Sequence, residues 1–166
     1  MANETKITAK PGEKEFTIER VFDAPRELVW RAYTDPELIP QWWGPRGFTT
    51  KIEENDFKPG GKWRWINTAP DGSSFAFYGE YREIKEPERI VWTFEFEGVP
   101  GHVSVQTAKF EEVDGKTKVT SIASFDTVED RDGMIQSGME VGVREGNERL
   151  DEVLENLKKV ENNVRK

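Results

Sequence analysis

The chain has 166 residues, of which 35% are hydrophobic and 34% are charged, and its formal net charge at pH 7 is −8. This length suits one domain with a sizeable core, and the acidic balance argues against general binding to nucleic acid or anionic lipid. Without Cys the chain has neither disulfides nor thiolate chemistry. No apolar run is long enough to cross a bilayer and no apolar signal region begins the chain, so we expect a soluble cytoplasmic protein.

The first quarter of the sequence predicts one strand and two short helices. Residues 1–13 are expected to be a flexible lead-in. Residues 15–22 alternate between two faces, as a strand does. The segment Asp23-Ala24-Pro25 begins a helix, because Pro suits the first helical turn. The segment Thr34-Asp35-Pro36 ends this helix and begins another short one.

Six further strands are expected in the middle of the chain, joined by short turns that imply antiparallel neighbours. Alternation along these strands places one set of aromatic residues on a common face. The expected strands are residues 48–57, 62–68, 74–84, 89–96, 103–113 and 116–126. The aromatic set is Trp63, Trp65, Phe75, Phe77, Trp92 and Phe94.

A long amphipathic helix is expected from Ser137 to about residue 159, after a helical region that opens at Thr127 and is divided at Gly133. Gly146 falls on the apolar stripe, where a Leu would be expected. Either the helix backbone packs closely on the sheet there, or a gap remains that something else fills. Asn147 could place an amide at the edge of such a gap. The apolar stripe comprises Met139, Val143, Gly146, Leu150, Val153, Leu157 and Val160.

These elements predict an α+β fold in one domain over residues 14–160, with a frayed tail at residues 161–166. About seven antiparallel strands form a curved sheet around the long C-terminal helix, and two short helices follow the first strand. This arrangement is the simplest way to bury the stripe of the helix.

Four segments carry a family resemblance that extends from about residue 16 to residue 157. They contain Asp-Ala-Pro and Trp-Trp-Gly-Pro in residues 21–48, Pro-Gly-Gly in residues 57–65, the strands of residues 78–98, and Ser-Gly-Met-Glu in residues 129–154. Together these motifs resemble bacterial proteins similar to the C-terminal domain of the activator of heat-shock protein 90 ATPase (AHSA-type), within the SRPBCC (START-like) superfamily. The pattern is specific for the family and not for a reaction.

The resemblance implies a helix-grip fold with a cavity between the sheet and the C-terminal helix. Members of the superfamily bind lipids, polyketides, hormones and other apolar molecules there, and some are cyclases or hydrolases. This favours the gap interpretation of Gly146. Relatives often carry a bulkier residue near Gly146 and Asn147, and other polar or charged residues at the positions of Asn67 and Gln106. The resemblance therefore implies a roomier pocket, of natural or engineered origin.

The expected ligand site combines the aromatic face with the stripe of the helix, and Trp42 and Trp43 would close its mouth. About half of its residues are expected to contact the ligand, because the rest must form the core. The candidate ligand-binding residues are Trp63, Trp65, Asn67, Phe75, Phe77, Trp92, Phe94, Gln106, Ser121, Met139, Val143, Gly146, Asn147 and Leu150.

Few residues point to catalysis. His102 is the one His in the chain, and we favour a partly exposed rim position for it over a general base. His102 and Asn147 are the weak catalytic candidates. One His and no Cys argue against a zinc or redox-metal site, and no cofactor is expected.

Three functions remain open. The first is binding of an apolar or aromatic small molecule by a monomer or homodimer, without nucleic acid or membrane insertion. The second is an enzyme of cyclase, hydrolase or lyase type that uses the same cavity. The third, ranked last, is a co-chaperone-like interaction domain.

Overall fold

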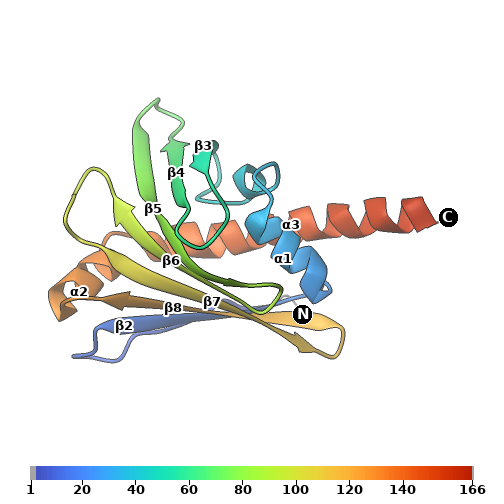
Figure 1. Ribbon diagram of the computed structural model, residues 1–166, viewed down its shortest axis with the longest axis horizontal. Coiled ribbons are helices and arrows are strands. Elements are labelled where there is room, and N and C mark those ends of the chain that lie inside the picture. Colours follow the sequence, from blue (N-terminus) through green and yellow to red (C-terminus); the bar gives the residue numbers. More distant parts are fainter. Residues whose placement is uncertain (1–2, 166) are drawn as a thin grey trace.

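The sheet and its helices are seen in a computed structural model that describes residues 3–165, with side chains described as far as residue 161. In Figure 1 the strands curve around the long helix α3, whose C-terminal part extends past the sheet. The strands are β1 (Lys6–Thr8), β2 (Glu15–Phe22), β3 (Thr49–Asn55), β4 (Lys62–Thr68), β5 (Ser74–Lys85), β6 (Arg89–Phe96), β7 (Ser104–Val113) and β8 (Lys116–Phe125). The helices are α1 (Arg26–Thr34), the short 3-10 helix η1 (Ile39–Gln41), α2 (Val128–Gln136) and α3 (Met139–Arg165).

The strands form one antiparallel sheet in the order β1-β2-β8-β7-β6-β5-β4-β3. The α+β helix-grip architecture is therefore confirmed, with eight strands in the described part of the chain in place of about seven. The additional strand is β1, where Ile7 lies opposite Ile18 of β2. It lies in the segment for which a flexible lead-in was expected.

The strand register places the predicted aromatic residues on one face, as the alternation indicated. Trp65 lies opposite Phe77, which lies opposite Phe96, and Trp92 lies opposite Gln106. Residues directly opposite each other in a sheet share a face. We call this the inner face, because its residues pack against the helices.

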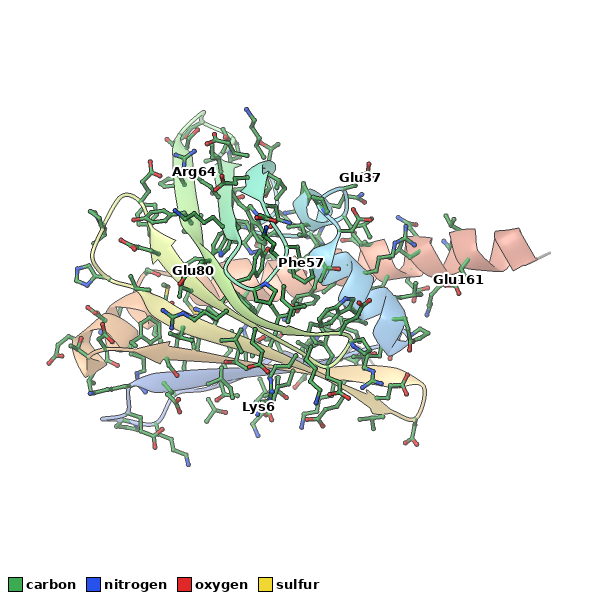
Figure 2. The ribbon with its side chains drawn as sticks, in the orientation of Figure 1. Lys6, Glu37, Phe57, Arg64, Glu80 and Glu161 are labelled. Carbon is green, nitrogen blue, oxygen red and sulfur yellow. The ribbon has the colours of Figure 1, made fainter. Side chains whose placement is uncertain are left out.

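The helices differ from the prediction mainly at their ends. The break between α2 and α3 falls at Gly138, whose φ of +89° favours Gly, and not at Gly133. Helix α3 continues to Arg165, through residues for which a frayed tail was expected. Figure 2 shows Glu161 on the part of α3 that lies past the sheet. No helix within residues 3–165 is long and apolar enough to span a membrane.

The buried apolar residues form two separate clusters. The larger one joins α1 and the middle of α3 to one end of the sheet and includes Val29, Phe110 and Leu150. The smaller one contains Phe16, Ala123 and Phe125, with Met139 packed against it. A domain of this size usually has one contiguous core with smaller satellite clusters beside it. The interruption is visible along β8, where Ser121 lies between Val119 of the first cluster and Ala123 of the second.

Candidate functional site

Gly146 packs directly against another part of the chain. A Cβ atom at this position would lie 3.2 Å from the carbonyl oxygen of Trp42 and 3.8 Å from the amide nitrogen of Gly44. The prediction of a gap beside Gly146 is therefore wrong. The close-packing interpretation is correct, although the partner is the loop between η1 and β3 and not the sheet. Absence of a side chain lets this loop approach the helix backbone.

Arg149, one turn further along α3, holds the same loop. Its Nη1 atom donates to the carbonyl oxygens of Gly44, at 3.0 Å, and of Pro45, at 3.2 Å. Partial burial, with the positive charge of Arg46 as a smaller cause, lowers the pKa of Arg149 below its ordinary value. The backbone N–H of Arg46 donates to the carboxylate of Glu145 at 3.1 Å. This loop, residues 42–46, is thus fixed to α3 along one side of the inner face.

Asn147 also has a structural partner. Its Nδ2 atom donates to Oγ1 of Thr5 at 2.9 Å, and Nη1 of Arg144 donates to the carbonyl oxygen of the same Thr at 2.7 Å. The two bonds attach the segment before β1 to α3. The expected role of Asn147 at the edge of a gap beside Gly146 is therefore wrong, because that gap is filled and the amide holds Thr5.

Replacing Asn147 with Ala is expected to loosen this attachment. Loss of one hydrogen bond should lower the free energy of unfolding by about 1 kcal/mol. Amides of β1 should exchange faster with solvent, as hydrogen exchange would measure. Thr5→Val removes the same bond from the other side, so the double variant should be no less stable than the worse single variant. Fully additive losses would show that the bond does not form in solution.

The aromatic residues of the inner face are less buried than their position suggests. Phe77 and Phe94 stack with ring centroids 5.3 Å apart, and Trp43 lies edge-on against Trp65, at 5.2 Å, and against Phe77, at 5.3 Å. Trp43 therefore covers part of the aromatic face. Its expected role in closing the mouth of the ligand site stays a prediction. The half-buried residues of this region are Trp65, Phe77, Trp92, Phe94, Phe96, Gln106, Ser121, Met139 and Val143.

Four of the expected site residues belong to the packing of the domain or to its edge. Trp63 and Leu150 lie in the larger core cluster. The buried Asn67 accepts a hydrogen bond from Thr50 at 2.6 Å and lies against Gly44. Phe75 is 37% exposed at the edge of the inner face.

Trp42, the other residue expected at the mouth, is a core residue. Its indole Nε1 atom donates to the carbonyl oxygen of Ala32 at 2.9 Å, and its ring packs against Tyr33 with centroids 4.8 Å apart. The prediction that it closes the mouth is wrong. Its hydrogen bond connects η1 to α1 and so positions Trp43, which follows it.

Two depressions among the described residues lie away from Gly146. The larger, about 420 Å³, opens mainly on the outer face and takes in the exposed edge of the inner face. Figure 2 shows Arg64, which lines this depression, on the ribbon of β4 and β5. Phe57, near the centre of the domain in the same view, does not line it. The smaller, about 160 Å³, lies beside the middle of α3. The larger is lined by Arg64, Ile66, Ser74, Phe75, Ala76, Phe96, Glu97 and Gly98. The smaller is lined by Asn3, Asp23, Asp151, Leu154 and Glu155.

His102 lies on the exposed loop between β6 and β7. Its Nδ1 atom is 2.8 Å from a carboxylate oxygen of Asp130, near the beginning of α2. The His102 side chain is 54% exposed, which agrees with the partly exposed position expected for it. The buried Ser104 nearby in sequence donates to the carbonyl oxygen of Phe94. Among the side chains described, in residues 3–161, no group of three or more His, Cys, Asp or Glu could hold a metal ion.

Comparisons with known proteins agree on the fold. The sequence profile of the family described as Activator of Hsp90 ATPase homolog 1-like protein matches residues 23–155. An Arthrobacter aurescens protein solved by NMR is 30% identical, with a TM-score of 0.84 and 91% of each chain covered. The crystal structure of Ms6760 from Mycobacterium smegmatis is 26% identical, with a TM-score of 0.83 and coverage of 90% of this chain and 96% of that one.

A more distant likeness is to DynU16, a protein in the dynemicin biosynthetic locus. It is 20% identical, with a TM-score of 0.65, and the match covers 86% of this chain and 48% of DynU16. At this identity the likeness shows the fold alone. No curated protein sequence matches the chain.

Proposed function

The chain belongs to the Activator of Hsp90 ATPase homolog 1-like family, and from this premise we propose that it binds an apolar or aromatic small molecule. The ligand would lie between the inner face of the sheet and the N-terminal half of α3. One observation carries the proposal: Trp65, Phe77 and Phe94 face the interior of the fold yet remain half-buried.

The energetic argument concerns the aromatic surface that the protein itself leaves uncovered. Burying an aromatic side chain fully removes about 150–250 Å² from water. A ligand that covers about 200 Å² of this surface would gain about 5 kcal/mol at 25 cal/mol per Å², before the costs of association. This gain offsets part of the cost of association, about 4–15 kcal/mol, and burial of the ligand's own apolar surface must supply the rest.

The surroundings of the aromatic face support a ligand position toward the N-terminal end of α3. Loop 42–46 and the segment at Thr5 attach to α3 at Arg149 and Asn147. Closer to the N-terminus of the helix, Val143 and Met139 are half-buried, and the core is interrupted at Ser121. The proposed site therefore lies beside residues 139–143 and not beside Gly146.

The same geometry supports binding over catalysis. His102 is exposed and paired with Asp130, and Asn147 is bonded to Thr5. Neither of the two catalytic candidates lies among the half-buried aromatic residues. The inner face beside those residues carries the uncharged polar groups of Gln106 and Ser121, which suit orientation of a ligand.

Filling the proposed site from the helix should block binding. In Val143→Trp the added indole would occupy the space of the ligand, so we expect the neutral dye N-phenyl-1-naphthylamine to bind at least about tenfold more weakly, a loss of about 1.4 kcal/mol. The matched control is Val141→Trp, which adds the same side chain at a position that is 59% exposed. Its affinity should stay within about twofold of the parent chain.

Dye fluorescence measures both affinities, and urea unfolding verifies that each variant is folded. Equal dye affinity in the parent chain and Val143→Trp would place the ligand elsewhere. A parent chain that binds neither this dye nor any of a panel of aromatic compounds would contradict the proposed function.

A further inference from the structure

Two buried indole groups have no hydrogen-bond partner among the described residues. They are the Nε1–H groups of Trp63 and Trp65, and both nitrogens are shielded from solvent. The other two buried nitrogens without a partner are Nε of Arg20 and of Arg26, whose guanidinium groups have further N–H donors. An indole has a single N–H, so the whole hydrogen-bonding capacity of these two side chains is unmet.

Both rings lie on the inner face at successive inward-facing positions of β4, with centroids 4.9 Å apart. The next aromatic groups around them are Phe94, 5.8 Å from Trp63, and Trp43, 5.2 Å from Trp65. Buried Trp N–H groups usually find an acceptor. Trp42 in this chain does so through the carbonyl oxygen of Ala32. The unmet donors are therefore a particular property of the proposed ligand face.

We propose that Trp63 and Trp65 donate hydrogen bonds to an oxygen atom of the bound molecule, so that the ligand is an aromatic or polycyclic compound that carries a carbonyl group. This inference rests on the proposed function. Because the two nitrogens are now covered, ligand entry must displace a neighbouring group, and the half-buried Trp43 packs edge-on against Trp65.

The charges of the site favour a neutral carbonyl over a carboxylate. Arg20 is the basic residue on the inner face of the strands, and its guanidinium group is already paired with the carboxylate of Asp151. The net charge of −8 also disfavours an anionic ligand. Two indole donors can hold a carbonyl oxygen, which has two lone pairs, without any charge.

Two probes of the same shape test the inference: 2-acetylnaphthalene, and 2-isopropenylnaphthalene, in which a C=CH₂ group replaces the C=O group. We expect the ketone to bind the parent chain about five- to tenfold more tightly than the alkene. In the Trp63→Phe, Trp65→Phe double variant this preference should fall to within about twofold. Calorimetry or displacement of N-phenyl-1-naphthylamine gives the affinities.

A second measurement needs no variant with altered packing. In ¹H–¹⁵N spectra of the parent chain, the indole N–H signals of Trp63 and Trp65 should move downfield with the ketone and not with the alkene. Equal affinities for the two probes and unmoved indole signals would overturn the carbonyl inference and leave the proposed function intact. If neither probe binds a parent chain that does bind N-phenyl-1-naphthylamine, the carbonyl inference alone is overturned. If the dye and the wider panel of aromatic compounds also fail to bind, both proposals are contradicted. If the double variant does not fold, the indole signals of the parent chain alone test the carbonyl inference.

Discussion

Replacing Asp151, which is 42% exposed, with Asn is expected to lower the free energy of unfolding by about 2 kcal/mol, because the change removes the charge that neutralises a buried guanidinium group. The Arg20 side chain is 4% exposed, and its two terminal nitrogens lie 3.0 Å and 2.6 Å from the carboxylate oxygens of Asp151. The same group lies 4.8 Å from the ring centre of Phe22. This pair connects β2 to α3, so its loss should weaken the packing of the sheet against the helix.

The adjacent residue on α3 supplies the control. Glu152 pairs with Arg46 at 3.0 Å, but both side chains are largely exposed. Glu152→Gln should therefore cost less than about 1 kcal/mol. Urea unfolding of both variants in the same buffer gives the comparison. If the two variants lose equal stability, Arg20 is solvated in solution and the connection between β2 and α3 does not depend on its charge.

Replacing Gly146 with Leu is expected to lower the free energy of unfolding by about 3 kcal/mol, the upper range for an overpacked core. The new Cβ would lie 3.2 Å from the backbone oxygen of Trp42, and a backbone atom cannot move aside as a flexible side chain can. The rest of the Leu side chain would have to push loop 42–46 away from α3.

Gly142→Ala is the matched control, one helical turn earlier. Its Cβ would meet Pro45 Cγ at 3.4 Å, which is close to ordinary contact, and Ala favours a helix over Gly by about 1 kcal/mol. We therefore expect Gly142→Ala to raise stability by up to about 1 kcal/mol. Urea unfolding again provides the measurement. A Gly146→Leu protein as stable as the parent chain would show that space exists beside residue 146 after all.

The strands were predictable because side-chain alternation encodes a face directly. Positions of Trp63, Trp65, Phe77, Trp92 and Phe94 on one face follow from their spacing along three strands, and the register confirms it. The short strand β1 was missed because three residues, Lys6–Thr8, are too few to display a period, and its pairing with β2 supplies the stability that its sequence does not indicate.

The environment of Gly146 was not predictable from local sequence. A Gly on a buried stripe shows that a side chain is missing, but not which group approaches. The approaching group is loop 42–46, about one hundred residues earlier in the chain, and its attachment depends on Arg149. The alternation of β2 places Arg20 on the same face as Phe16, but the sequence does not indicate that its partner is Asp151 on the distant α3.

The position of a bound aromatic molecule tests the central claim most directly. In a complex with N-phenyl-1-naphthylamine, intermolecular nuclear Overhauser effects would identify the protein atoms that contact the dye. We expect contacts to the methyl groups of Val143 and to the rings of Phe77 and Phe94. Contacts confined to Ile66 and Ala76 in the depression on the outer face, or no contacts at all, would contradict binding between the sheet and α3.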